Sequence, residues 1–226
     1  MLLDTNDYYI ILDAGDGIYK VDKYIKTKKP IYLFLSHFHL DHIFGLHILN
    51  KFEFKQPLRI YGKEGTKEIV NQIADNPFTK PLSKLSYKVV VKELNQGKHE
   101  LPFRTTCKLL PHPNPSLGYR FDLDGKIITY CTDTGPHENV FDLAKNADVF
   151  ISECAYKSGH IDKEWSHMDP EEAAKIAKKT KVKQLILTHF DAAEYRTIKE
   201  RKEAEKNARK IFENTIAGLD DMELEI

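Results

Sequence analysis

A chain of 226 residues is long enough for one large α/β domain or two small ones. Hydrophobic residues make up 41% of it, enough for a sizeable core, and 34 basic and 34 acidic residues give a formal net charge of zero. These values exclude the globally basic surface of many nucleic-acid-binding domains, although a local basic patch stays open.

Neither a membrane span nor a secretion signal is expected. No apolar run approaches the roughly 18 residues that a membrane span requires, and the first residues lack the basic start and apolar stretch of a signal peptide. The three cysteines, Cys107, Cys131 and Cys154, form no paired spacing, and the last two lie in or beside apolar runs. We expect these to be buried thiols of a reducing compartment, so the protein is predicted to be cytoplasmic. With no apolar span, no membrane contact is expected.

The first apolar run, residues 8–12, predicts a strand that ends at Asp13. The chain begins almost at this strand. Two interpretations of Asp13 stay open. It is a carboxylate that orients a ligand histidine, or it is a turn aspartate of the kind common before glycine.

A second buried strand is predicted over residues 31–35, and a metal-binding pattern follows it. The pattern places three histidines and one aspartate within six residues, and it reads Ser36-His37-Phe38-His39-Leu40-Asp41-His42. In an extended chain His37 and His39 point the same way, whereas Asp41 and His42 come after the chain has turned. One loop could in this way serve two metal ions, and imidazole with carboxylate suits zinc, iron or manganese.

The next elements are predicted from periodicity and turn residues. Residues 42–51 and 64–75 have helical character, and residues 57–61 and 89–91 are strand-like. The prolines of residues 76–83 predict a loop, which is either a plain connector or a rim over the site.

The second half of the chain repeats the pattern of a strand followed by a polar residue. Residues 103–110 predict a strand, and His112 follows it in a loop stiffened by three prolines. Asp124-Gly125 predicts the tight turn of a hairpin, which ends shortly before Asp133. Residues 147–152 predict a further strand, which ends at Glu153.

Helices are expected at residues 141–145, from Asp169 to about Thr180, and over residues 195–212. Asp169-Pro170-Glu171-Glu172 has the N-cap, the proline and the acidic residue of a capping box. The charged residues of the C-terminal helix predict a solvated face. Between the last two helices, residues 184–188 predict a strand that ends at His189.

This ordered series resembles the metallo-β-lactamase-fold superfamily. The motif of that superfamily is H-x-H-x-D-H, followed downstream by a histidine, an aspartate and a histidine, each after a strand. Here His112, Asp133 and His189 take those three places, and the resemblance covers nearly the whole chain. It implies an α/β fold of the αββα type, a four-layer sandwich that residues 1–226 would form as a single domain.

The resemblance also implies a dinuclear site with two divalent metal ions, zinc first, with manganese and iron as alternatives. Carried over by position, the ligands of one metal would be His37, His39 and His112. The ligands of the other would be Asp41, His42 and His189. Asp133 would bridge the two metals.

Within the superfamily the sequence is most similar to the RNase Z-like branch. Three segments carry this similarity: His112 followed by Gly118-Tyr119-Arg120, the run Thr132-Asp133-Thr134-Gly135-Pro136, and His167 ahead of the helix that leads to His189. In that branch the histidine that matches His167 contacts the scissile phosphate or protonates the leaving group. His167 also precedes a helix N-terminus, which favours a phosphate. The alternative is a surface histidine that flanks the helix.

Two departures from this branch affect the expected substrate. Only twenty residues, filled by the hairpin, separate His112 from Asp133, so the long tRNA-binding arm of bacterial RNase Z has no room. The early strand and loop that usually open the family's fold are also not expected here. Together with the neutral charge, these departures favour a resemblance to armless phosphodiesterases of cyclic or small substrates.

We therefore expect a phosphodiesterase that cleaves a cyclic or small linear phosphodiester with a dinuclear-metal hydroxide, with Asp41 positioning or deprotonating the water and His167 as general acid. The alternatives are a tRNA 3′-processing endoribonuclease and a hydrolase of a carboxylic ester, lactone or lactam. A redox enzyme is disfavoured by His39, because diiron flavoproteins resemble H-x-E-x-D-H. A non-catalytic nucleic-acid-binding module, RNA as a partner and a homodimer stay open.

Overall fold

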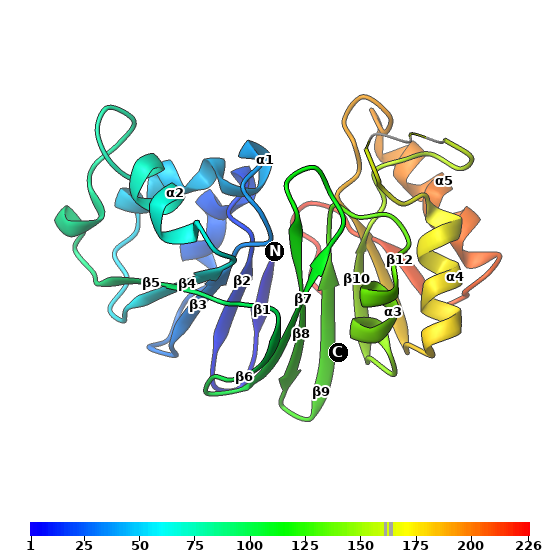
Figure 1. Cartoon of the computed structure of the whole chain (residues 1–226), viewed down its shortest axis with the longest axis horizontal. Helices are drawn as coiled ribbons and strands as arrows, with labels where there is room; N and C mark the ends of the chain where they lie inside the picture. Colours follow the sequence, from blue (N-terminus) through cyan, green and yellow to red (C-terminus); the bar gives the residue numbers. More distant parts are fainter. Residues whose placement is uncertain (161, 163–164) are drawn as a thin grey trace. The chain divides into compact units, whose positions relative to one another are not determined.

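The computed structural model describes residues 1–160, 162 and 165–226. They form two compact units, Met1–Asn95 and Gln96–Ile226. Each unit contains one β-sheet with helical segments packed on it (Figure 1). The predicted mixed α/β fold with two sheets and helices is confirmed. The grouping of both units into a single domain stays a prediction.

The sheet of the first unit has the order β1-β2-β3-β4-β5. Its strands are β1 Leu2–Asp4, β2 Tyr9–Leu12, β3 Ile31–Phe34, β4 Leu58–Gly62 and β5 Val89–Glu93. β1 is antiparallel to β2, and the remaining neighbours are parallel. An early strand therefore does precede β2, and the expectation that it is missing was wrong. β1 contains only three residues, too few to show a period of its own.

The helical segments of the first unit are η1 Asp16–Lys23, α1 Leu40–Ile43, η2 Phe44–Lys51, α2 Thr66–Ile73 and η3 Leu82–Lys84. The helix predicted over residues 42–51 is instead a single α-turn followed by a 3-10 segment. Side chains from one face of the sheet, including Ile11, Leu33 and Ile60, pack with Leu46 and Val70 of these segments into one core. Strand side chains two residues apart share a face, so one face of the sheet supplies this core.

The sheet of the second unit has the order β12-β11-β10-β9-β8-β7-β6. Its strands are β6 Gly97–Glu100, β7 Arg104–Leu110, β8 Ser116–Leu123, β9 Lys126–Cys131, β10 Val149–Glu153, β11 Gln184–Thr188 and β12 Thr215–Ala217. Strands β9 to β12 are parallel, whereas β6 to β9 are antiparallel. The predicted Asp124-Gly125 turn joins β8 to β9, and both of its residues have positive φ, as the tight hairpin turn requires.

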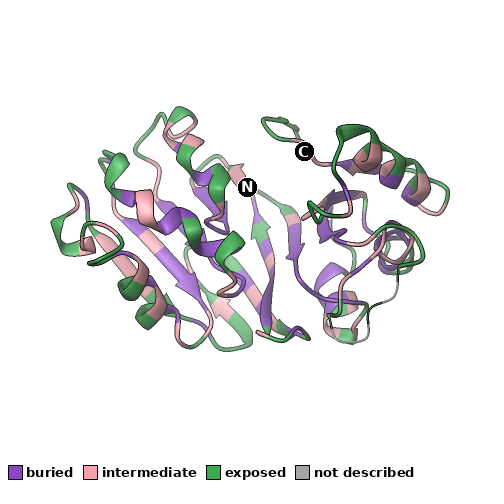
Figure 2. Ribbon diagram, turned by 90° about the horizontal axis from the view of Figure 1, so that it is seen from above, coloured by how far each residue is buried: buried purple, intermediate pink, exposed green. Residues whose placement is uncertain are grey.

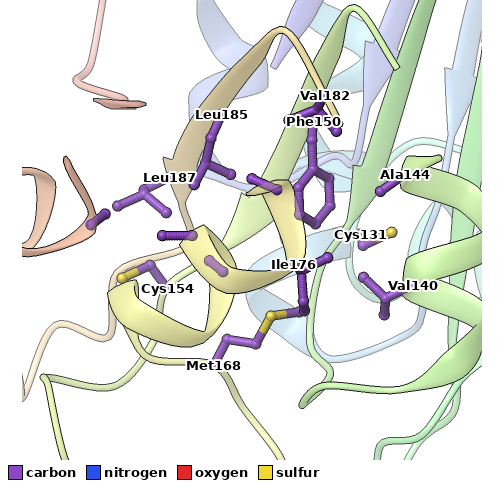
Figure 3. Packing of buried hydrophobic residues seen from close by; sticks show 14 of the residues in the cluster. Cys131, Val140, Ala144, Phe150, Cys154, Met168, Ile176, Val182, Leu185 and Leu187 are labelled. Atoms are coloured by element: carbon purple, nitrogen blue, oxygen red, sulfur yellow. The ribbon is translucent and has the colours of Figure 1, made fainter. Parts of the chain in front are cut away.

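Three helices, α3 Glu138–Ala144, α4 Pro170–Thr180 and α5 Ile198–Arg209, share one core with the second sheet (Figure 1). Figure 3 shows strand residues such as Phe150 and Leu185 packed against Val140 of α3 and Ile176 of α4. The capping box predicted at Asp169 is present in both directions. It stabilises the start of α4, directly after the segment that carries His167.

Most strands are buried, except β1, β5 and β6, which are half-buried or exposed. Figure 2 shows buried residues along most strands and within the helices, and exposed residues mainly on helices and loops. All three cysteines are buried free thiols, and burial raises the pKa of Cys107 to about 12. Among the described residues no helix has the length and apolar character to cross a membrane.

Gly45 of η2 supports the first unit through a close backbone contact. Its N–H donates to the Ala14 carbonyl over 2.7 Å, and an added Cβ would lie 2.6 Å from the Gly15 oxygen. We expect Gly45→Ala to lower the free energy of unfolding by about 1–3 kcal/mol, because the crowding involves rigid backbone. Urea denaturation checks this. Gly17→Ala is the control, since nothing lies within 4 Å of its added Cβ. An equal effect of the two substitutions would contradict the prediction.

Candidate metal centre

Two neighbouring parallel strands of the first unit end at the polar residues predicted from sequence. β2 is followed by Asp13, and β3 leads into the histidine-rich loop. The carboxyl ends of parallel neighbours lie at the same edge of a sheet. The two loops are joined there by backbone hydrogen bonds, from Asp13 to the Phe34 carbonyl over 2.9 Å and from Ala14 to the His42 carbonyl over 2.8 Å.

Asp13 orients His42. Its Oδ2 lies 2.8 Å from His42 Nδ1, and both side chains are buried. The same carboxylate accepts hydrogen bonds from the Ser36 backbone N–H at 2.6 Å and the Ser36 hydroxyl at 2.8 Å. With Nδ1 engaged, Nε2 is the His42 nitrogen that can bind a metal. Of the two interpretations of Asp13, the geometry therefore favours the orienting carboxylate.

The other candidate ligands of this loop surround His42. The His37 ring centroid lies 4.5 Å from that of His39 and 4.3 Å from that of His42. His37 is buried, and His39 is half-buried. The Asp41 side chain is 65% exposed, with Oδ2 3.2 Å from His42 Nε2, so this carboxylate can reach both His42 and water. All four candidates of the first unit are thus clustered.

In the second unit four polar residues follow strands that run in one direction. β9, β10 and β11 are parallel, and β7 shares their direction because both β7 and β9 are antiparallel to β8. His112, Asp133, Glu153 and His189 stand at or just beyond the carboxyl ends of these strands. They therefore gather at one edge of the sheet.

Asp133 lies among the histidines of this unit. Its Oδ1 is 3.9 Å from His112 Nε2, and its Oδ2 is 3.4 Å from His189 Nε2. One possible ligand atom from each of Asp133, His167 and His189 lies within 4.8 Å of the others. A buried carboxylate facing imidazole nitrogens is a donor set that fits a divalent cation such as zinc, manganese or iron.

Glu153 was named in the sequence only as the end of a strand, but it holds His167. The Nδ1 of His167 lies 2.9 Å and 3.0 Å from the two Glu153 oxygens. This buried carboxylate also accepts backbone N–H groups from Thr134, Ala155 and Met168. The missed signal was its position at a strand end, which Asp13 shares. Glu153 leaves the Nε2 of His167 to face a substrate or metal.

The pKa of the His167 imidazole is raised above its usual value. Burial by itself lowers this pKa, but the hydrogen bond and the negative charge of Glu153, together with Asp133, outweigh the burial. His167 therefore keeps its proton to a higher pH than an ordinary histidine, as a general acid near neutral pH requires.

Three residues of these clusters have a left-handed backbone. Asp13, Asp133 and His189 have φ values of 57°, 51° and 52°. Each follows a strand. Because its φ is positive, its side chain does not point where the regular up-and-down alternation of the strand would place it. Non-glycine residues in this region carry a cost on the order of 1–2 kcal/mol each, and such outliers concentrate at functional sites.

All seven predicted ligands thus lie in a cluster of their own unit. His37, His39, Asp41 and His42 belong to the first unit, and His112, Asp133 and His189 belong to the second. The distribution of metal ions over these residues stays a prediction.

Comparisons with known proteins agree with the motif. A family model described as a beta-lactamase superfamily domain matches residues 8–190. Ribonuclease Z of Enterococcus faecalis is 27% identical, with 99% of this chain and 90% of that protein covered. The probable metallo-hydrolase YhfI of Bacillus subtilis is 30% identical, with 84% and 78% covered.

Solved structures show the same fold. The metallo-beta-lactamase fold protein YhfI from Bacillus subtilis has a TM-score of 0.76 at 22% identity, with 96% of this chain and 86% of that chain covered. Human tRNase Z, short form, has a TM-score of 0.68 at 24% identity, with 85% of each chain covered.

Proposed function

Because the chain belongs to the metallo-β-lactamase superfamily of metal-dependent hydrolases, we propose that it hydrolyses a cyclic or small linear phosphodiester. The observation that carries this proposal is the placement of His167. Glu153 holds its Nδ1, and its neighbours are the candidate metal ligands Asp133 and His189. An acid beside a metal site suits a reaction in which an alkoxide must leave a phosphate.

Two divalent metal ions, zinc first, would be held by the seven ligands His37, His39, Asp41, His42, His112, Asp133 and His189. When bound, they lower the pKa of water toward about 7 and neutralise the phosphate oxygens. The exposed Asp41 carboxylate orients the attacking water and accepts its proton. His167 donates its Nε2 proton to the leaving oxygen, because its Nδ1–H is engaged by Glu153.

The hairpin between His112 and Asp133 supports a small substrate. β8 and β9 fill this interval with a two-residue turn, so nothing in it resembles an arm for holding a tRNA. The alignment with the Enterococcus ribonuclease Z spans 286 positions, more than the 226 residues of this chain. The relative is thus longer than this chain in the aligned region, which supports the proposal that this chain has no arm.

The second candidate is an RNA-processing endonuclease. The relatives named ribonuclease Z favour it, since several are 26–29% identical across most of this chain. One panel of substrates tests both candidates with the zinc- or manganese-loaded protein. We expect turnover of bis-p-nitrophenyl phosphate and of cyclic nucleotides, and none of precursor tRNA. Cleavage of the tRNA alone would replace the first candidate by the second. Turnover confined to an ester, lactone or lactam would overturn both.

Metal removal is expected to abolish activity and to destabilise the fold. A ligand at about 100 times its Kd stabilises a protein by about 2.7 kcal/mol, so dialysis against a chelator should lower Tm by about 5–10 °C. Elemental analysis should find about two metal ions per chain before dialysis, and added zinc or manganese should restore activity. Full activity in the metal-free protein would contradict the mechanism. A homodimer and a cytoplasmic location stay predictions from the sequence.

A further inference from the structure

The chain has one tryptophan, and it lies beside the cluster of the second unit. The Trp165 ring centroid is 5.5 Å from that of His112, and the two planes meet at 71°, an edge-to-face contact. His112 is buried, yet Trp165 is 44% exposed. Exposed apolar side chains are common on this chain, but Trp165 combines its exposure with a contact to a candidate metal ligand.

The segment that carries Trp165 is fixed to the strand ends. The Tyr156 hydroxyl donates to the Trp165 carbonyl at 2.8 Å, and the Ser166 hydroxyl accepts the Gly135 backbone N–H at 3.1 Å. Two residues further on, the Met168 N–H donates to Glu153 at 3.1 Å. A platform held in this way loses little conformational entropy when a ligand stacks on it.

Other aromatic rings connect Trp165 with the candidate acid. The Tyr156 ring lies edge to face with His167 at 5.3 Å, and His167 lies 5.1 Å from His112. The indole and the His167 imidazole therefore both contact the His112 ring. A flat group stacked on Trp165 would therefore lie near the candidate acid.

We propose that Trp165 is a base-stacking residue, so that the substrate is a phosphodiester with a nucleobase next to the scissile phosphate. This proposal rests on the phosphodiesterase function and narrows its substrate class. Every nucleobase has a π-face that stacks on an aromatic side chain without need of a sequence-specific contact. One platform accepts one base, whereas proteins that follow a nucleic-acid strand use several in succession. A cyclic or small nucleotide therefore fits better than a polynucleotide.

Tryptophan fluorescence tests the stacking without turnover. Because Trp165 is the only tryptophan, the emission of the metal-loaded protein reports on this position alone. We expect saturable quenching on titration with AMP. Ribose 5-phosphate and inorganic phosphate, which lack the base, should leave the emission nearly unchanged. Equal quenching by all three, or none by AMP, would overturn the proposal.

Matched substrates test the effect on catalysis. Thymidine 5′-p-nitrophenyl phosphate and methyl p-nitrophenyl phosphate release the same product and differ by the nucleoside. We expect Trp165→Ala to lower kcat/KM roughly 5- to 100-fold for the first, mostly through KM, and less than about 2-fold for the second, since stacking contributes ~1–3 kcal/mol per base. Trp165→Phe should restore part of the loss. Equal losses on both substrates would mean that no base is stacked.

Tyr19→Ala provides a control, because Tyr19 is 47% exposed but lies in η1, away from the second unit's cluster in sequence. It should change neither substrate's kinetics, and a selective loss for the nucleoside substrate would contradict the assignment to Trp165. If the wild-type protein hydrolysed neither compound, the phosphodiesterase function would fail. The AMP titration would still decide whether Trp165 stacks on a base.

Discussion

Replacing Asp133 by asparagine is expected to lower kcat/KM for phosphodiesters by on the order of 10³-fold and to reduce the bound metal. Metal ions contribute several kcal/mol of transition-state stabilisation, which corresponds to about two to four decades in rate. Asp133 is the buried carboxylate nearest to both His112 and His189, so its charge is central to the donor set of the second unit. Steady-state kinetics and elemental analysis of the same preparation measure the two effects.

Asparagine is the informative replacement because it tolerates the left-handed backbone that Asp133 adopts. The fold should therefore persist while the negative charge is lost. Asp124→Asn is the matched control, since Asp124 has nearly the same φ, 52°, but lies exposed in the β8–β9 turn. It should retain activity and metal. A fully metal-loaded, active Asp133→Asn protein would remove Asp133 from the site.

Replacing His167 by alanine should lower kcat about 10²- to 10⁴-fold, the usual range for a general acid, while the metal content stays near that of the wild type. A loss of kcat without a loss of bound metal would identify His167 as a general acid, whereas a loss of both would identify it as a metal ligand. His160→Ala is the control, because His160 also lies near a carboxylate, Glu194 at 3.3 Å, but is exposed. Substrates with a p-nitrophenolate leaving group, which needs little protonation, should be affected least.

Glu153→Gln tests whether the carboxylate positions and charges His167. In the wild type Glu153 raises the pKa of His167, so the acid form persists to higher pH. Removal of the charge lowers that pKa, and the alkaline limb of the kcat profile should move to lower pH. The NH₂ group of glutamine would also face a buried backbone N–H that now donates to the carboxylate. This costs about 1–3 kcal/mol of folding stability, so Tm must be measured alongside. An unchanged alkaline limb in a folded variant would mean that Glu153 does not act through His167.

The clustering of most candidate site residues was predictable because these residues follow strands with strong apolar patterns. Buried parallel strands such as β3 and β11 are recognised from short apolar runs, and the polar residue after each run marks the carboxyl end of the strand. The capping box at Asp169 is similarly local. Such signals need no knowledge of the partner segments.

The missed features depend on contacts between distant segments. β6 and β12 are short edge strands whose sequences show no distinct period, so only their pairing with β7 and β11 defines them. Glu153 lies at a strand end as the predicted ligands do, but its role depends on His167, fourteen residues later. Residues 42–51 do not form one helix, and Gly45 in this stretch lies against Ala14 and Gly15, a contact that the sequence does not reveal.

The candidate ligands are distributed unevenly along the chain, and this has a consequence for biosynthesis. Those of the first unit come from one loop and are in place once Met1–Asn95 has folded, whereas those of the second unit require β7, β9 and β11 to pair. His189 is synthesised about 90 residues after Asn95, roughly 5–20 s later at translation rates of ~5–20 residues per second. During that interval the candidate ligands of the first unit, three imidazoles and a carboxylate, are already part of the nascent chain. Metal uptake can therefore begin in the first unit before the other ligands exist.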